Sequence, residues 1–132
     1  MRTIFLIMIG LSWLYSAEIV TDKKTGLVWQ DNSYAKSMKK DWSDSKDYCQ
    51  NLILDGQSDW RLPTIKELQS IVNIKKSHPA IKEGFKNVAG SYWSSSDCVS
   101  NTSSAWFVVF HSGSTLSRAK TKKYYVRCVR GR

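Results

Sequence analysis

The stretch Asp59-Trp60-Arg61-Leu62-Pro63-Thr64 joins two segments of helical pattern and specifies much of its own local structure. Leu62 precedes a proline, which disfavours the helical conformation at that residue and favours an extended one. Thr64 opens the sequence Thr64-Ile65-Lys66-Glu67, which has the form of a capping box. In such a box the threonine hydroxyl and the glutamate carboxylate each accept a backbone N–H from the other residue. The stretch therefore predicts a junction that anchors Trp60 in the core and begins a helix after Thr64.

Apolar side chains recur at helical spacing on both sides of this junction. A helix is predicted before it, from residue 42 to about residue 54. Asp41 or Ser43 is expected to cap the start of this helix, and Gly56 to cap its end. A second, shorter helix follows the junction, and its apolar face consists of Ile65, Leu68, Ile71 and Val72.

Segments rich in β-branched and aromatic residues predict strands before and after the helices. The predicted strands cover residues 18–22, 26–30, 91–96, 105–110, 115–118 and 124–130. The first two are expected to form a hairpin, and residues 105–110 are apolar on both faces, which is typical of a central strand. Residues 31–41 are polar and are expected to form a loop. The order of the elements predicts an α+β domain with an antiparallel sheet.

The N-terminal segment has the features of a secretory signal peptide. A basic start, Met1-Arg2-Thr3, is followed by an apolar run over residues 4–15 and by small residues. We expect a signal peptide at residues 1–16 and one domain at residues 17–132. The run is shorter than the ~20 apolar residues that span a bilayer; an uncleaved membrane anchor is the alternative. Export would place the domain in the periplasm or outside the cell.

Basic residues dominate the C-terminal end of the sequence. The formal net charge is +9, and Asp97 is the last acidic residue. The basic residues that follow it are Arg118, Lys120, Lys122, Lys123, Arg127, Arg130 and Arg132. Such a concentration is typical of a surface that binds polyanions, but it also occurs on a solvated edge that keeps a protein soluble. Export argues against nucleic acid as the partner.

Motifs along nearly the whole chain resemble one known family. They are, in order, Thr25-Gly26-Leu27-Val28-Trp29-Gln30, Tyr48-Cys49, Asp59-Trp60-Arg61-Leu62-Pro63-Thr64, Glu67-Leu68, Tyr92-Trp93-Ser94-Ser95-Ser96, Ala105-Trp106 and Val126-Arg127-Cys128-Val129-Arg130. They resemble the Legionella collagen-like protein (Lcl) C-terminal domain family, a bacterial family whose fold is similar to that of C-type lectin-like domains. The resemblance implies an α+β domain in which two helices flank a mainly antiparallel sheet and the N- and C-terminal strands come together.

Three cysteines in an exported chain suggest one disulfide and one remaining cysteine. The similarity to lectin-like domains implies that Cys49 and Cys128 form the disulfide. Cys98 is then either a free buried thiol or an intermolecular link. Neither cysteine nor histidine occurs in close ligand pairs, so a zinc site is not expected.

The sequence contains no motif typical of catalysis or of a cofactor site. The serines at residues 94–96 lack the glycines of a nucleophile elbow, and His78 and His111 are expected to be ordinary surface or core residues. The Glu-Pro-Asn, Gln-Pro-Asp and Trp-Asn-Asp triplets of calcium-dependent sugar-binding lectins do not occur. We therefore expect no enzymatic activity, no cofactor and no metal.

The aromatic residues and the junction are expected to be structural. Large aromatic side chains dominate the cores of small domains, so core packing is preferred over a sugar-stacking platform for Trp29, Trp42, Trp60, Trp93 and Trp106. Asp59 and Arg61 are expected to form a local salt bridge or a turn bond rather than to bind a ligand.

The predicted function is that of an exported, non-enzymatic binding module for acidic glycans or another anionic surface. Its expected partner is an acidic polysaccharide, and its expected ligand-binding residues are Arg118, Lys120, Lys122, Lys123 and Arg130. Each would make an electrostatic contact that weakens as the salt concentration rises. The alternative is a structural or protein–protein interaction subunit of a cell-envelope assembly.

Overall fold

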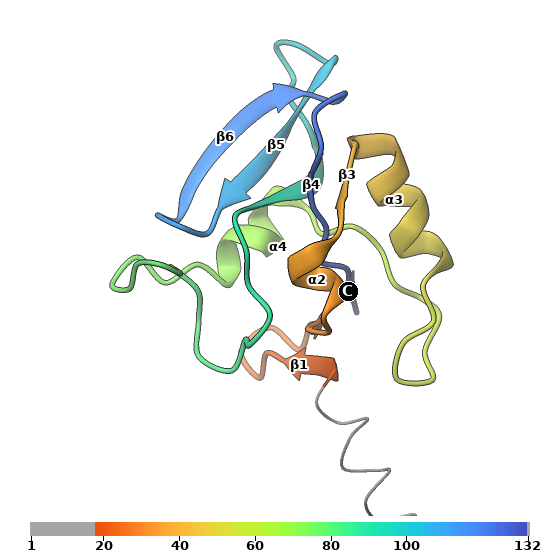
Figure 1. Cartoon of the computed structure of the whole chain (residues 1–132), viewed down its shortest axis with the longest axis vertical. Helices are drawn as coiled ribbons and strands as arrows, with labels where there is room; N and C mark the ends of the chain where they lie inside the picture. The colour runs from red at the N-terminus through yellow and green to blue at the C-terminus, as the bar shows by residue number, and fades with distance from the viewer. Residues whose placement is uncertain (1–17, 132) are drawn as a thin grey trace, which may run out of the picture.

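The computed structural model describes residues 18–131, and these residues form two β-sheets with helices packed beside them (Figure 1). The predicted signal peptide at residues 1–16 and Arg132 lie outside the described residues. The smaller sheet has the order β1-β2-β8, with strands β1 (Ile19–Thr21), β2 (Val28–Gln30) and β8 (Val129–Arg130). The larger sheet has the order β3-β7-β4-β5-β6, with strands β3 (Lys39–Lys40), β7 (Tyr124–Tyr125), β4 (Ser91–Asp97), β5 (Ser104–Val109) and β6 (Ser114–Ala119).

The strand pairing confirms the predicted α+β class. Only the pairing of β4 with β7 is parallel among the strand pairs of the described residues, and the others are antiparallel. The N-terminal hairpin and the central position of β5 are as predicted. Trp29 on β2 pairs with Val129 on β8, so the first and last strands of the domain lie side by side.

The single strand predicted over residues 124–130 is wrong, because this segment contributes to both sheets. β7 belongs to the larger sheet and β8 to the smaller one. The intervening Val126, Arg127 and Cys128 are buried. The side-chain bonds of Arg127 and the disulfide of Cys128 hold the chain between the sheets, which a β-rich sequence pattern does not reveal.

The loop predicted over residues 31–41 is also wrong, since it contains a short helix and an edge strand. Helix α2 (Tyr34–Ser37) has its backbone N–H at Ala35 bonded to the Asn32 side chain at 3.3 Å, and Ala35 is buried. Strand β3 follows and pairs with β7, with Lys40 opposite Tyr124. Both elements depend on tertiary contacts, so their polar sequence did not predict them. The described residues therefore contain three helices, where two were predicted.

The two predicted helices are present, with the expected caps at their starts. Helix α3 (Trp42–Asn51) begins where the Asp41 carboxylate accepts the backbone N–H of Asp44 at 2.9 Å. Helix α4 (Ile65–Ser70) follows the predicted capping box. In that box the Thr64 hydroxyl accepts the Glu67 N–H at 3.2 Å, and the Glu67 carboxylate accepts the Thr64 N–H at 2.9 Å.

The predicted cap at Gly56 is wrong, because α3 ends before it. Leu52 occupies the C-terminal cap position. Asp55 and Gly56 instead have φ angles of 54° and 71° and form the turn of a minimal hairpin. Leu54 and Gln57 flank that turn and exchange backbone hydrogen bonds of 3.0 Å. Asp-Gly is a preferred dipeptide for two consecutive left-handed residues in such a turn.

The core confirms the packing role for part of the tryptophan set. Trp29, Trp60 and Trp93 are buried, whereas Trp42 and Trp106 are half-buried. The Cys49–Cys128 disulfide implied by the family resemblance is confirmed, and it joins α3 to the segment between β7 and β8. It spans 79 residues of sequence, and a loop of that length corresponds to roughly 4 kcal/mol of stabilisation in the loop-entropy treatment. Cys98 is buried and free of disulfides within the chain.

No helix within residues 18–131 is long and apolar enough to cross a membrane.

Candidate binding surface

Arg127 is buried, so it does not belong to the exposed basic residues of the C-terminal segment. Its Nη1 atom donates to the Gln30 carbonyl at 2.6 Å and lies 3.1 Å from Oδ1 of Asp31. Its Nη2 atom donates to the carbonyl of Asn87. The side chains of Arg127 and Asp31 are 0% and 2% exposed. This arginine therefore organises the interior and is closed to ligands.

Arg130 is already engaged with the junction that precedes α4. Its Nε atom donates to Asp59 Oδ1 at 2.7 Å, and its Nη2 atom donates to Oδ2 at 3.1 Å. Hydrogen bonding from Arg130 holds the pKa of the exposed Asp59 carboxyl below its usual value. Arg130 lies on the smaller sheet, apart from the strand and turn that carry the other four predicted ligand-binding residues.

Arg61 also pairs within the chain, but with a different partner. Its two terminal nitrogens donate to the two carboxylate oxygens of Glu67 at 2.6 and 2.8 Å. Nη2 also donates to the carbonyl of Gly131 at 2.8 Å. These bonds hold the pKa of the Glu67 carboxyl below its usual value. Arg61 thus forms a local salt bridge, as expected, whereas Asp59 pairs with the distant Arg130.

Lys120 lies at a contact between β6, β4 and the start of α3. Its ammonium group is 2.5 Å from Asp97 Oδ1 and donates to the Thr102 carbonyl at 2.7 Å. It lies 4.1 Å from the centroid of the Trp42 ring, and the ammonium group of Lys46 lies 4.4 Å from the same centroid. The Trp42 ring is therefore within cation–π range of both ammonium groups.

Arg118, Lys122 and Lys123 remain exposed. They form no salt bridge with any residue in the described part of the chain. Lys122 and Lys123 lie in the turn that leads from β6 into β7. Of the five predicted ligand-binding residues, these three present an unpaired charge to solvent.

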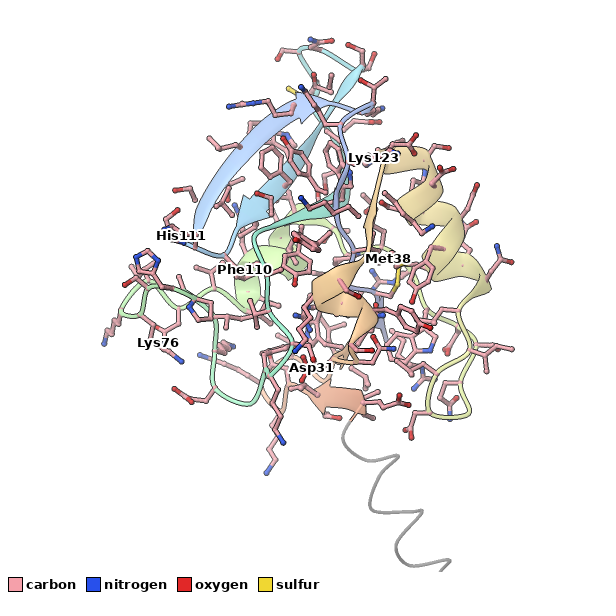
Figure 2. All side chains as sticks on the ribbon, viewed as in Figure 1. Asp31, Met38, Lys76, Phe110, His111 and Lys123 are labelled. Carbon is pink, nitrogen blue, oxygen red and sulfur yellow. A yellow bond between two sulfur atoms is a disulfide. The ribbon has the colours of Figure 1, made fainter. Side chains whose placement is uncertain are left out.

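Further lysines, distant in sequence, join this turn through the pairing of β3 with β7. Lys40 lies opposite Tyr124, the residue that follows Lys123, and Lys39 lies opposite Tyr125. Figure 2 labels Met38 and Lys123, the residues that precede the paired positions on the two strands. We call the combined set the lysine rim, which consists of Lys39, Lys40, Lys46, Lys120, Lys122 and Lys123. The first three were not predicted from the sequence, because they lie outside the basic C-terminal segment. The adjacent pair Lys39-Lys40 is the feature of the sequence that could have indicated them.

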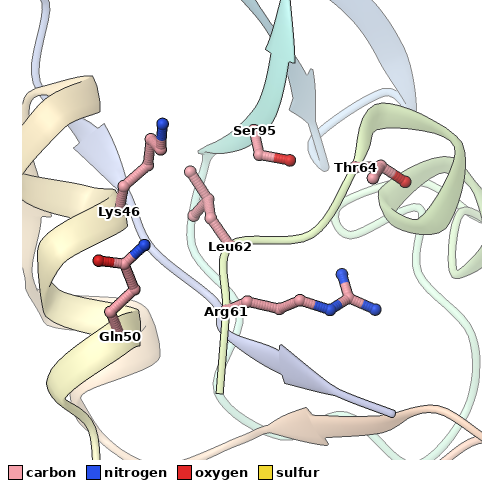
Figure 3. Close-up of a pocket in the computed structure, with 6 residues that line it drawn as sticks. All are labelled: Lys46, Gln50, Arg61, Leu62, Thr64 and Ser95. Atoms are coloured by element: carbon pink, nitrogen blue, oxygen red, sulfur yellow. The ribbon is translucent and has the colours of Figure 1, made fainter. Parts of the chain in front are cut away.

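A cavity of about 260 Å³ opens beside the rim, between α3 and the junction. It is lined by Lys46, Gln50, Arg61, Leu62, Thr64 and Ser95. Figure 3 shows that Lys46 and Gln50 reach from α3 toward the side of Leu62, whereas the Arg61 guanidinium points away from α3. The Lys46 ammonium, the Gln50 amide and the Ser95 hydroxyl are donors suited to a single anionic group.

Comparison with models of known families shows to which family the chain belongs. The family model described as the Lcl C-terminal domain matches residues 18–130. The chain belongs to the Lcl C-terminal domain family. The match includes both sheets, the disulfide and every residue of the lysine rim. A search of curated proteins found no match.

Ser94 and Cys98 in this Lcl C-terminal domain have local partners. The Ser94 hydroxyl is buried and donates to the Trp106 carbonyl at 2.7 Å. The hydrogen bond between Cys98 and Ser100 lowers the pKa of the Cys98 thiol. Within residues 18–131, no three histidine, cysteine or carboxylate side chains gather as a metal site. The expectation that the domain is not an enzyme stays a prediction.

Proposed function

We propose that this Lcl C-terminal domain is an exported, non-enzymatic module that binds acidic polysaccharides through the lysine rim. The observation that carries the proposal is the exposure of Lys122 and Lys123 without an ion-pair partner in the described residues. Lys122 follows Lys120 by two residues, and the Lys120 ammonium group lies over the Trp42 ring. A polymer with repeated sulfate or carboxylate groups can engage several such charges at once.

Ion pairs within the chain reduce the number of predicted residues whose charge is free to bind a ligand. Lys120 and Arg130 are held by Asp97 and Asp59, so their charges are partly neutralised before any ligand arrives. Lys39 and Lys40 add positive charge from the edge strand β3. Lysines on an edge strand also prevent unwanted pairing with another sheet, so their presence alone does not require a ligand. The proposal rests on Lys122 and Lys123, which lie in a turn.

Two features support the fold and the location included in the proposal. The pairing of the first and last strands and the disulfide between α3 and the C-terminal segment agree with a C-type lectin-like arrangement. The disulfide also favours an oxidising compartment, either the periplasm or the outside of the cell.

Retention on immobilised heparin tests the proposal. The variant Lys122→Glu/Lys123→Glu should elute at a lower salt concentration than the wild type, because two contacts to sulfate groups become repulsive. The matched control is Lys23→Glu/Lys24→Glu, which makes the same change of charge at two exposed lysines of the β1–β2 turn. Lys120 is left intact, since its reversal would disturb Asp97 and Trp42.

Equal elution of the rim variant and its control would overturn the proposal, because retention would then depend on net charge alone. Salt-insensitive capture of an envelope protein without glycan retention would favour the alternative of a structural subunit.

A further inference from the structure

Two histidines far from the lysine rim place their ring nitrogens next to each other. Nδ1 of His78 lies 2.9 Å from Nδ1 of His111. The ring centroids are 3.7 Å apart, and the ring planes meet at 79°. Both residues are exposed, so the pair contributes little to the core. It has no part in the proposed binding of anions.

The backbone holds the two histidines in this position. The N–H of His78 donates to the carbonyl of His111 at 3.1 Å, and the N–H of Ala80 donates to the carbonyl of Phe110 at 2.7 Å. These bonds fix the loop before β4 against the end of β5, where Figure 2 labels His111. His78 has a φ angle of 53°, which few residues other than glycine adopt. The backbone therefore holds the two histidine residues next to each other.

The separation of the two nitrogens is suited to one shared ion once the rings turn. With both in-plane lone pairs aimed at the ion, the ring centroids would lie about 4.5 Å apart, compared with 3.7 Å in the pair without metal. Both side chains are exposed, so the rings are free to make this change. A metal ion about 2.0 Å from each nitrogen would subtend an N–metal–N angle of roughly 90° at this separation. That is the angle between neighbouring ligands in the tetragonal geometry of Cu²⁺ and Ni²⁺, whereas tetrahedral Zn²⁺ prefers a wider angle. Cu²⁺ also binds nitrogen donors most tightly among the divalent first-row metals.

We propose that His78 and His111 form a two-histidine site for a divalent transition metal, with Cu²⁺ as the ion that fits best. Without metal, one Nδ1–H donates to the other Nδ1. On binding, that proton moves to Nε2 of the same ring, and both Nδ1 lone pairs coordinate the ion. No redox change is involved.

The surroundings leave the remaining coordination positions open. A cavity of about 330 Å³ lies beside the pair, lined by His78, Pro79, Val88, Ala89 and His111. The other three lining side chains carry no ligand atoms, so water molecules would complete the coordination. Within residues 18–131, no third histidine, cysteine or carboxylate side chain joins the pair.

Calorimetric titration with Cu²⁺ in a weakly coordinating buffer tests the site. The wild type should bind one Cu²⁺ per chain, and its electron paramagnetic resonance spectrum should show two coupled nitrogens. His78→Asn and His111→Gln should each weaken binding by about tenfold or more, because the second imidazole acts at a high effective concentration. Asparagine is chosen at position 78 because it tolerates a positive φ angle.

The double variant His78→Asn/His111→Gln supplies the control for other copper ligands, such as the Cys98 thiol or the chain N-terminus. Near-ultraviolet circular dichroism checks that each variant is folded. Unchanged Cu²⁺ binding by the folded double variant would overturn the proposal, as would a wild type that takes up no Cu²⁺. Tighter binding of Zn²⁺ than of Cu²⁺ would overturn the geometric argument.

Discussion

Arg127 and Asp31 form an ion pair that is closed to solvent, with Nη1 and Oδ1 3.1 Å apart. Asp31 also accepts the backbone N–H groups of Lys86 and Asn87 at 3.0 and 2.9 Å. One carboxylate therefore ties the end of β2 to the loop before β4 and to the segment between the two sheets. The arginine that seemed to belong to a basic surface is the centre of this connection.

Removing Arg127 should destabilise the fold strongly. Arg127→Met leaves the Asp31 carboxylate buried without its cation, and loss of one partner of a buried pair costs about 3–5 kcal/mol. The exposed Arg118→Met is the matched control and should change the free energy of unfolding by less than about 0.5 kcal/mol. Urea unfolding followed by tryptophan fluorescence measures both. Equal stability of the two variants would contradict the structural role of the pair.

The bonds of Glu67 predict a dependence of stability on pH. Its folded-state pKa lies below the ordinary value of 4.5, first because of the Arg61 hydrogen bond and despite desolvation. A depressed folded-state pKa contributes stability above the unfolded-state value, and that stability is lost as the pH falls through the folded-state value. The wild type should therefore exceed Glu67→Gln in unfolding free energy at neutral pH. The difference should shrink progressively below about pH 4.5.

Unfolding curves of both proteins at several pH values measure this difference. Thr64→Ala serves as a comparison, because it removes the cap through a hydroxyl that does not titrate. It should cost about 1 kcal/mol at neutral pH. This cost should change with pH much less than the Glu67 difference, because the Thr64 hydroxyl lowers the pKa of Glu67 less than Arg61 does. The contrary result is a difference in unfolding free energy between the wild type and Glu67→Gln that stays constant as the pH falls below about 4.5. That result would show that the Arg61–Glu67 pair does not set the pKa of Glu67.

Trp60 links the opening junction to stability rather than to the proposed ligand. Its side chain is buried, and its Nε1–H donates to the Gln57 carbonyl at 3.1 Å. Trp60→Ala should cost about 3–5 kcal/mol, as expected for a large aromatic residue removed from a core. The folded fraction should keep the heparin retention of the wild type. A fully stable variant that has lost only heparin retention would show that Trp60 belongs to a binding site.

The sequence predicted the parts of the fold that depend on local chemistry. The capping box at Thr64 and the cap at Asp41 involve bonds over a few residues, and both are present. The division of residues 124–130 between two sheets depends on the distant Gln30 and Cys49, so a local pattern could not show it. The family resemblance supplied the disulfide.

The candidate site was predictable only in part, for the same reason. Exposed charge in the turn containing Lys122 and Lys123 was visible as a basic sequence. The partners that occupy Lys120 and Arg130 lie 23 residues or more away in sequence, at Asp97 and Asp59. The contribution of Lys39 and Lys40 required the pairing of β3 with β7. Charge counts thus identified the region but not which cations are free.

Lys120 should therefore contribute mainly to stability and Lys122 mainly to anion binding, although the two lysines are two residues apart. Lys120→Gln loses the ion pair with Asp97 and the contact with Trp42, and each such interaction at a partly exposed site is worth up to about 1 kcal/mol. Lys122 has neither partner, so Lys122→Gln should leave the free energy of unfolding unchanged within about 0.5 kcal/mol. In heparin retention the order should reverse, with Lys122→Gln eluting at the lower salt concentration, because its charge is free for the ligand. The same ranking of the two variants in both measurements would mean that stability and anion binding are not divided between these lysines as the contacts indicate.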